Sequence, residues 1–237
     1  MLVPAYNEAA GLAASLASIH AARAAFTSRG WTTELIVCDN NSSDATPAIA
    51  AGAGARVVFE PVNQIGRARN AAAAAATGDW LVFVDADSHP TVALFADAAE
   101  AIASGRFLAG GSTVRMTGGT WLGDALVGGW NLTSRVTRWA AGAFIFVDAT
   151  AFRAAGGFSP HLYATEEIDL FRRLKRLARA ERRRVTILSR HPLSTSGRKM
   201  HLYTPIELAG MALRTVLSGG RALRRAEQCF VWYDGRR

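Results

Sequence analysis

Cysteine is nearly absent from this sequence. The 237 residues contain only Cys38 and Cys229, which lie far apart in the chain. Two distant cysteines are too few for a disulfide-stapled scaffold, and they lack the paired spacing of a zinc knuckle. Because free thiols persist in a reducing compartment, this composition favours a cytoplasmic protein.

Long apolar runs are also absent. No stretch approaches the roughly 18 consecutive apolar residues that a membrane-spanning helix needs. Pro4, Asn7 and Glu8 interrupt the start of the chain, so it does not resemble a signal peptide. Half of the residues are hydrophobic and 19% are charged, a balance that favours a folded domain with a substantial core.

Acidic residues are scarce in the last third of the chain. Residues 1–171 contain 10 basic and 15 acidic residues, a net charge of −5, whereas residues 172–237 contain 17 and 4, a net charge of +13. This split predicts an anionic partner for the C-terminal part, such as a phospholipid surface or a phosphorylated substrate. No zinc-finger, RNP or KH signature accompanies the basic residues, so we expect no nucleic-acid partner.

Short apolar runs alternate with helical patterns in the first hundred residues. The pattern predicts strands over residues 2–5, 34–38, 56–59 and 80–84, and helices over residues 11–25, 44–53 and 66–76. Such alternation implies parallel strands joined by helical crossovers. In sheets of this kind, ligands bind beyond the carboxyl ends of the strands.

The pattern changes after about Gly105. A Gly/Trp-rich stretch over residues 118–142 precedes a predicted strand over 143–147 and an amphipathic helix over 166–178. Another predicted strand over 185–188, a polar loop over 191–199 and a helical region from about residue 205 follow. We find no internal repeat and no linker that would separate two folding units. The sequence therefore predicts a single α/β domain over residues 1–237.

Two carboxylates, Asp85 and Asp87, follow the predicted strand over residues 80–84 directly. Separated by one residue at the carboxyl end of a strand, they converge on the ligand side of the sheet. Hard oxygen ligands of this type suit Mg²⁺ or Mn²⁺, which in turn coordinate phosphate oxygens. Asp is also common in solvated turns after strands, so this pair alone leaves both interpretations open.

Polar clusters follow the other three predicted strands as well. The further motifs are Val3-Pro4-Ala5-Tyr6-Asn7-Glu8, the run from Cys38 to Thr46, the run from Asn63 to Asn70, Gly156-Gly157-Phe158 and Thr165-Glu166-Glu167-Ile168-Asp169-Leu170. Each motif alone is weak, but their combination in this order is specific. With these motifs, most of the chain resembles family 2 glycosyltransferases with the GT-A fold.

The resemblance implies a metal-dependent transfer of a sugar from a nucleotide-diphosphate donor, with a UDP-sugar favoured. Residues 1–105 then form a mostly parallel, Rossmann-like nucleotide-binding half, and residues 106–237 an acceptor-binding and catalytic half. On the donor side, the matched positions are Pro4, Tyr6 and Glu8 around the nucleotide, Asp39 at the base, Arg69 near the phosphates, Asp85 beside the ribose or metal, and Asp87 as the direct ligand of Mn²⁺ or Mg²⁺.

The family's base lies in an acidic pair that opens a helix, commonly Glu-Asp, and here the pair is Glu166-Glu167. The resemblance implies an inverting transfer in which Glu167 occupies the usual Asp position and takes the acceptor proton. A structural interpretation of the same residues is that Thr165 caps the helix and both glutamates favour its positive end. Asp169 lies nearly one turn along the helix and is expected to pair with Arg172 or Arg173.

The polar loop predicted over residues 191–199 also carries candidate ligands. Its position is similar to that of the mobile C-terminal segment of some family members, which implies that Arg198 and Lys199 meet the donor pyrophosphate. His191 either assists the metal or is a hydrogen-bonded loop residue. The tryptophans of the Gly/Trp-rich stretch either line an acceptor site or pack in the core.

Two other functions fit part of this pattern. A nucleotidyltransferase also uses paired carboxylates and a metal, but it normally needs a Gly-rich, basic phosphate loop after the first strand, which residues 4–8 do not offer. A non-catalytic nucleotide-sugar binding module is compatible with the glutamate that replaces the usual aspartate at position 167.

The basic C-terminal part has two interpretations of its own. Arg214, Arg221, Arg224 and Arg225 lie among apolar residues, a mixture compatible with a helix on the inner face of an anionic membrane. Peripheral docking of this kind would place the site beside a lipid-linked acceptor. The alternative is a solvated face of a helix that packs on its own domain.

Overall fold

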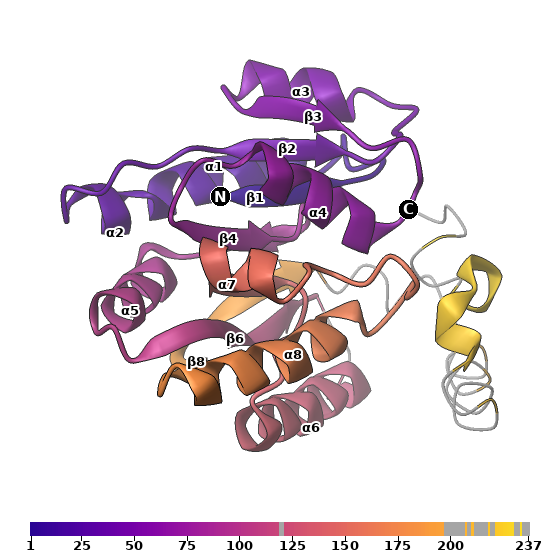
Figure 1. Ribbon diagram of the computed structural model, residues 1–237. Helices are drawn as coiled ribbons and strands as arrows, with labels where there is room; N and C mark the ends of the chain where they lie inside the picture. The colour runs from indigo at the N-terminus through magenta and orange to yellow at the C-terminus, as the bar shows by residue number, and fades with distance from the viewer. Residues whose placement is uncertain are drawn as a thin grey trace.

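The computed structural model describes residues 1–118 and 121–196, together with residues 207, 210, 218, 221–229 and 233 (Figure 1). Arg198, Lys199 and Arg214, and most of the helical region predicted from about residue 205, lie outside the described residues.

The described strands form one eight-stranded sheet in the order β3-β2-β1-β4-β7-β6-β8-β5. They are β1 (Leu2–Ala5), β2 (Ile36–Asp39), β3 (Arg56–Phe59), β4 (Trp80–Val84), β5 (Ser88–His89), β6 (Phe107–Thr117), β7 (Phe144–Asp148) and β8 (Arg184–Ser196). Strands β1 to β4 pair in parallel. Strand β7 then runs antiparallel to both β4 and β6, while β8 is parallel to β6 and antiparallel to β5. The predicted α/β class is confirmed.

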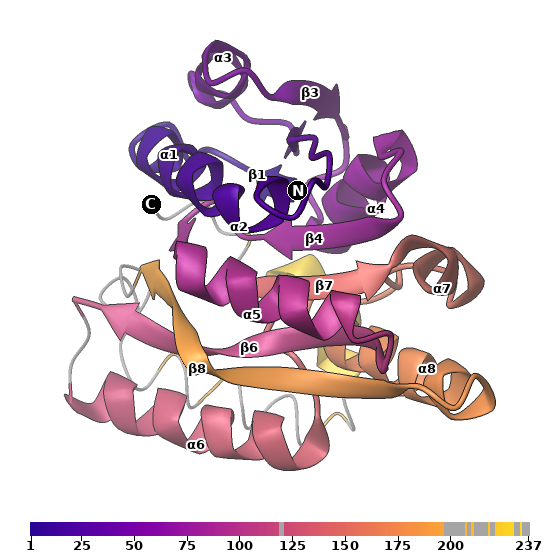
Figure 2. The same ribbon diagram turned by 90° about the vertical axis from the view of Figure 1, so that its left-hand side faces the viewer.

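Helices cover both faces of this sheet (Figures 1 and 2). They are α1 (Leu12–Ala22), α2 (Ala24–Thr27), α3 (Thr46–Gly52), α4 (Ile65–Ala75), α5 (Val92–Ala103), α6 (Trp121–Thr137), α7 (Ala149–Ala154) and α8 (Glu166–Ala180), with the 3₁₀ turns η1 (Arg221–Arg224) and η2 (Ala226–Cys229). Helices α1, α2 and α5 share one apolar cluster with the sheet, and α4, α7 and α8 share the other.

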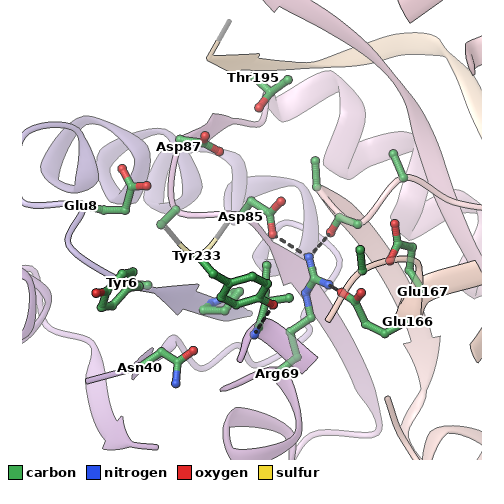
Figure 3. Close-up of a pocket in the computed structure, with 18 of the residues that line it drawn as sticks. Tyr6, Glu8, Asn40, Arg69, Asp85, Asp87, Glu166, Glu167, Thr195 and Tyr233 are labelled. Atoms are coloured by element: carbon green, nitrogen blue, oxygen red, sulfur yellow. Dashed lines mark hydrogen bonds and ion pairs between the residues drawn. The ribbon is translucent and has the colours of Figure 1, made fainter. Parts of the chain in front are cut away.

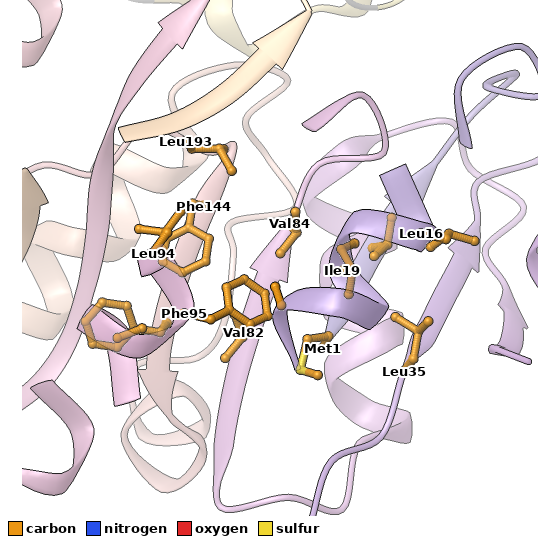
Figure 4. Packing of buried hydrophobic residues seen from close by; sticks show 14 of the residues in the cluster. Met1, Leu16, Ile19, Leu35, Val82, Val84, Leu94, Phe95, Phe144 and Leu193 are labelled. Carbon is orange, nitrogen blue, oxygen red and sulfur yellow. The ribbon is translucent and has the colours of Figure 1, made fainter. Parts of the chain in front are cut away.

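Alternation along the central strands explains the two clusters. Val82 and Val84 of β4 point to the cluster of α1 and α5, whereas Leu81 and Phe83 point to that of α4 and α8. Figure 4 shows Val82 and Val84 packed toward Phe95 of α5. Because successive side chains of a strand face opposite sides, a strand covered on both faces must be apolar throughout.

Strand β6 was not predicted, and its glycines show why it can lie where it does. A Cβ atom on Gly110 would lie 2.4 Å from Cζ of Phe146, and one on Gly111 would lie 2.4 Å from Cβ of Ala140. Neighbouring side chains therefore fill the space that larger residues in β6 would need. Glycine weakens strand propensity, so this buried strand lacks the usual sequence signal.

The structure corrects several boundaries in the second half. The loop predicted over residues 191–199 is wrong for residues 191–196, because β8 continues to Ser196 and pairs with both β6 and β5. The Gly/Trp-rich stretch forms α6, and α5 is a further helix that the prediction omitted. Among the residues that the structure describes, no helix has the length and apolarity required to cross a membrane.

Candidate active site

A pocket of about 280 Å³ opens at the carboxyl ends of β1 and β4, and it also reaches the start of α8. Figure 3 shows the side chains that converge there from both halves of the chain. The predicted residues that line it are Pro4, Tyr6, Glu8, Arg69, Asp85, Asp87, Glu166 and Glu167. The fold thus brings together residues that are far apart in the sequence.

The loops after β1 and β2 are held to each other by side chains. The Asn7 N–H donates to Ser42 Oγ at 3.0 Å, and Asn7 Oδ1 accepts from the Ser43 N–H at 2.8 Å. The Glu8 N–H donates to Thr46 Oγ1 at 2.8 Å. These bonds hold the backbone of the first loop, which presents Tyr6 and Glu8 to the pocket.

Asp39 is buried beside the pocket and is not among its lining residues. Its Oδ1 accepts the Ser42 N–H at 3.0 Å, and Asn41 has a positive φ of 68°. The Asp39 carboxylate and the left-handed backbone of Asn41 therefore shape the turn after β2. The next residue, Asn40, lines the pocket instead, and its Oδ1 accepts the Gln64 N–H at 2.9 Å.

Arg69 lies at the centre of the site and is 2% exposed. Its Nη1 is 2.7 Å from Glu166 Oε1, and its Nη2 is 2.8 Å from Asp85 Oδ1. Nη2 also donates to the Gly142 carbonyl at 3.1 Å, where a Cβ atom on Gly142 would lie 2.7 Å from Nη2. The guanidinium therefore joins a carboxylate that follows β4 to one that opens α8.

The electrostatics of Arg69 follow from these two contacts. Burial by itself lowers the pKa of Arg69, but attraction to Asp85 and Glu166 outweighs this and holds the pKa above its ordinary value. Removing one partner of an ion pair this buried strongly destabilises the folded protein, because the other charge is left buried without a counter-charge.

Glu167 has a different environment from its neighbour. It is half-buried and lines the pocket, whereas Glu166 is buried against Arg69. Burial, and then repulsion by Glu166, hold the pKa of Glu167 well above the ordinary 4.5 of a glutamic acid. Two adjacent carboxyl groups in unlike environments are suited to unlike roles in proton chemistry.

Thr165 occupies the N-cap position of α8, but its side chain does not cap the helix. Thr165 has a positive φ of 62°, and its side chain makes no capping hydrogen bond, so the side-chain cap of the structural interpretation is wrong. Its backbone carbonyl accepts the Ile168 N–H at 3.1 Å. The pairing expected for Asp169 is confirmed, because its Oδ2 lies 2.6 Å from Arg173 Nη2. Glu166 and Glu167 thus follow directly on a backbone conformation that few β-branched residues adopt.

Asp85, Asp87 and Glu8 all line the same pocket. Within the described part of the chain, no group of three or more His, Cys, Asp or Glu side chains is arranged to hold a metal ion. Mg²⁺ and similar ions are often held by one or two carboxylates together with substrate phosphates. The two aspartates fit a divalent ion that a phosphorylated ligand helps to bind.

His191 lies apart from this pocket. Its Nδ1 is 2.9 Å from Asp97 Oδ2, and it is not among the lining residues. The hydrogen-bonding interpretation of His191 is the one that the structure supports. Likewise, Trp130 and Trp139 pack against the apolar clusters and do not line the pocket.

Tyr233 is a pocket residue that the sequence interpretation missed, as is Thr195. The Tyr233 phenol donates to the Tyr163 carbonyl at 3.0 Å and accepts the Ile65 N–H at 3.3 Å. The two tyrosine rings meet edge to face at 5.3 Å, and burial raises the pKa of Tyr233. One hydroxyl thus bridges the start of α4 and the loop before α8, a contact that no periodicity in the sequence indicates.

The comparisons with known proteins agree with this geometry. Residues 1–154 match the model of the family described as glycosyl transferase family 2. The chain belongs to glycosyl transferase family 2. The motifs that end β1 to β4 all lie within the matched residues.

Solved structures share the fold over nearly the whole chain. One is residues 1–349 of TarS from S. aureus in complex with UDP-GlcNAc, with a TM-score of 0.66, 19% identity, and coverage of 98% of this chain and 70% of that one. Another is glucosyl-3-phosphoglycerate synthase from Mycobacterium tuberculosis with Mn²⁺, UDP-glucose and phosphoglyceric acid, with a TM-score of 0.60, 21% identity, and coverage of 96% and 78%.

A third is the mannosyltransferase PcManGT from Pyrobaculum calidifontis with GDP-mannose and Mn²⁺, with a TM-score of 0.60, 20% identity, and coverage of 81% and 55%. These neighbours have the GT-A fold of glycosyltransferases, and at such identities the likeness establishes the fold of this chain.

A curated sequence relative matches a shorter region. A TPR repeat-containing protein of Synechococcus elongatus is 53% identical over 55 residues, which are 23% of this chain and 14% of that protein. The match therefore spans about one seventh of the length of that relative.

Proposed function

We propose that this chain is an inverting glycosyltransferase that moves a sugar from a nucleotide-diphosphate donor, with a UDP-sugar favoured, to an acceptor hydroxyl. The observation that carries the proposal is that Asp85, Asp87, Glu166 and Glu167 line one pocket, in which Arg69 joins Asp85 to Glu166. Membership of family 2 supports transfer from a nucleotide sugar. The complexes of its structural neighbours with UDP-GlcNAc and UDP-glucose support the choice of nucleotide.

The donor lies along the loops after β1 to β4 in this proposal. Pro4, Tyr6 and Glu8 contact the nucleotide from the first loop, and Asp39 takes the nucleobase from its buried position beside Asn40. Arg198 and Lys199 are proposed to contact the pyrophosphate. Mn²⁺ or Mg²⁺, held by Asp87 and Asp85, would neutralise the negative charge of the diphosphate leaving group.

Arg69 acts as a positioning residue in this proposal. The sequence interpretation placed it near the donor phosphates, but its charge is already matched by Asp85 and Glu166. Its planar guanidinium contacts both carboxylates at once, so it fixes the donor side of the pocket relative to the start of α8.

Glu167 is the base of the proposed reaction. The acceptor hydroxyl gives its proton to the Glu167 carboxylate while its oxygen attacks the anomeric carbon, and the bond from that carbon to the diphosphate oxygen breaks. One displacement of this kind inverts the anomeric configuration. A base with a raised pKa holds the transferred proton better than an ordinary glutamate would.

The acceptor is proposed to be lipid-linked, with the protein peripheral on the inner face of a membrane. Support comes from Arg221, Arg224 and Arg225, all of which are exposed, because basic residues beside apolar ones favour anionic surfaces. A soluble phosphorylated acceptor is the second candidate. It is favoured by the phosphoglyceric acid bound in a structural neighbour, together with the charge of +13 over residues 172–237.

The test is a panel of UDP-, GDP- and dTDP-sugars, assayed with Mn²⁺ and with EDTA against lipid-linked and soluble acceptors. We expect metal-dependent release of a nucleoside diphosphate, and the configuration of the product identifies inversion. Release of pyrophosphate would instead indicate a nucleotidyltransferase. Tight donor binding without any release would indicate a binding module.

Asp87→Ala tests the metal directly. We expect this variant to lose about tenfold or more in donor affinity with Mn²⁺, since one charge-assisted contact is worth about 1.5–3 kcal/mol. With EDTA, the variant and the wild type should bind the donor equally weakly. Calorimetric titration of UDP under the four conditions measures this, and equal affinity in all four would contradict a metal bridge.

A further inference from the structure

A second hollow, of about 310 Å³, lies between the end of α6, the C-terminal half of α8 and the start of β8. Its lining includes five basic residues and no acidic one: Arg138, Lys175, Arg179, Arg183 and Arg184. We call it the basic hollow. Lys175 lies eight positions after Glu167 on α8, which corresponds to about 12 Å along the helix axis, so the hollow is separate from the active-site pocket.

The charges around the basic hollow are poorly balanced. Arg183 pairs with Asp148 and Glu181, at 3.3 and 3.4 Å. In the described part of the chain, the other four basic residues form no ion pair with a carboxylate. Burial, and then repulsion by Arg138, Arg179 and Arg172, lower the pKa of Lys175. Like charges gathered in a concave site without counter-charges favour an anionic ligand.

An exposed apolar ridge adjoins the hollow on α6. Ala125, Gly129, Leu132 and Val136 lie on one face of the helix at spacings of four, three and four residues, and Leu126 lies beside them. Leu126, Leu132 and Val136 are 57%, 64% and 75% exposed. Val136 also lines the basic hollow, so the two features are continuous.

The ridge lies on the outer side of the molecule. In Figure 1, α6 forms the lower edge beside α8, and in Figure 2 it again lies outside β6 and β8. Exposed apolar side chains on a soluble surface commonly mark an interaction site. A helix that presents an apolar face next to basic residues has the pattern of a helix at the surface of a membrane.

From the continuity of the ridge and the basic hollow, we propose that α6 and the C-terminal half of α8 form a docking surface for an anionic phospholipid bilayer. The basic hollow receives lipid phosphates, and Leu126, Leu132 and Val136 enter the acyl boundary. This surface is distinct from the C-terminal arginines. It does not depend on the proposed transfer reaction, because docking needs neither donor nor acceptor.

The experiment is co-sedimentation of the full chain with vesicles of phosphatidylcholine containing increasing phosphatidylglycerol, at low and high salt. The hollow variant is Arg138→Gln/Lys175→Gln/Arg179→Gln, and the ridge variant is Leu132→Ser/Val136→Ser. A matched control, Arg29→Gln/Arg56→Gln/Arg153→Gln, removes three exposed arginines elsewhere. A fourth variant, Arg221→Gln/Arg224→Gln/Arg225→Gln, removes the C-terminal charges.

We expect the wild type to bind only vesicles with anionic lipid, and less at high salt. The hollow variant should lose roughly 10²-fold in affinity, since each basic residue contributes modestly near an anionic surface. The ridge variant should lose binding to a similar extent, while the control variant keeps it. Circular dichroism of the same preparations shows that each variant is folded. Donor affinity, measured beside it, separates this result from failure of the proposed function.

Several outcomes would overturn the proposal. They are binding that ignores lipid charge, equal loss in the control variant, and loss confined to the C-terminal variant. Complete competition by millimolar inorganic phosphate would indicate a site for a soluble phosphate instead. Self-association in the absence of lipid that the ridge variant abolishes would indicate a second copy of the chain as the occupant.

Discussion

The two ends of helix α8 carry opposite charges, and each end has a group whose charged form is disfavoured by burial. At its start, Glu166 and Glu167 line the pocket, one buried against Arg69 and the other with a raised pKa. At its other end, Lys175 and Arg179 line the basic hollow, and the pKa of Lys175 is lowered. Between them, an apolar face holds the helix to the sheet; its buried residues are Leu170, Phe171, Leu174 and Ala178.

This comparison shows that the fold requires the buried apolar face of α8 but not the charges at its two ends. The buried face alone would dock the helix, and the helix dipole favours acids at the start and bases at the end by only about 0.3–1 kcal/mol each. At both ends, burial and repulsion by like charges nevertheless disfavour ionisation of one group, Glu167 at the start and Lys175 further along. Such arrangements reduce stability and recur at functional sites.

Arg69→Met should have the largest effect and break the organisation of the acidic end. It leaves Asp85 and the buried Glu166 without their counter-charge, so the free energy of unfolding should fall by about 3–5 kcal/mol. Urea denaturation followed by circular dichroism measures the change. The matched control is Arg173→Met, which removes the more exposed ion pair with Asp169 on the same helix and should cost only about 0.3–0.5 kcal/mol. If both variants lose the same free energy of unfolding, burial does not make the Arg69 ion pairs more important for stability than the exposed pair.

Glu167→Gln should come next and sharpen the distinction between the two glutamates. Removing the proposed base should lower the transfer rate by about 10²-fold or more while donor affinity is kept. Asp169→Asn, two positions further along the helix and paired with Arg173 in the wild type, is the control and should transfer normally. If Glu166→Gln stops transfer while Glu167→Gln does not, the base has been assigned to the wrong residue of the pair.

The smallest of the three expected effects is on the pH dependence of stability, which should have opposite signs for Glu167 and Lys175. Because the folded-state pKa of Glu167 is raised, the folded chain holds this proton more tightly, and stability is lost as the pH rises above 4.5. The pKa of Lys175 is lowered, so the charged ammonium group destabilises the fold. This destabilisation disappears as the pH rises toward 10.5 and the group loses its proton.

Melting temperatures of wild type, Glu167→Gln and Lys175→Gln, taken from about pH 5 to the ordinary lysine pKa of 10.5, test this. The Glu167→Gln variant should gain stability relative to wild type as the pH rises, because only the wild type must ionise the carboxyl group at this position. The gain of Lys175→Gln over wild type should shrink at alkaline pH. If the melting temperatures of all three chains change in parallel with pH, the shifted pKa values of Glu167 and Lys175 are contradicted.

The parallel half of the fold could be predicted from the sequence, and the antiparallel half only partly. Strands β1 to β4 are short apolar runs, and helical patterns follow the first three of them, so local periodicity sufficed for these elements. Strand β6 contains Gly110 and Gly111, and α6 contains Gly128 and Gly129, residues of low propensity for strand and helix. The course of β6 depends on packing against Phe146 and Ala140, which no local pattern contains.

The candidate site shows the same division. Asp85, Asp87 and the Glu166-Glu167 pair could be predicted because their motifs are local. The pairing of Arg69 with Glu166 spans 97 residues of sequence, and it changed the role proposed for the arginine. Tyr233 and Thr195 reach the pocket only through the tertiary fold, as does Asn40 in place of its neighbour Asp39.

The bridge made by Tyr233 has a consequence for the order in which the site is completed during synthesis. A ribosome adds Pro4 and Tyr6 of the pocket wall first and Tyr233 more than two hundred residues later. The phenol that bonds Ile65 and Tyr163 is therefore the last part of this wall to be made. A nascent chain can fold its parallel strands early, yet its pocket stays open on one side until residue 233 has left the exit tunnel.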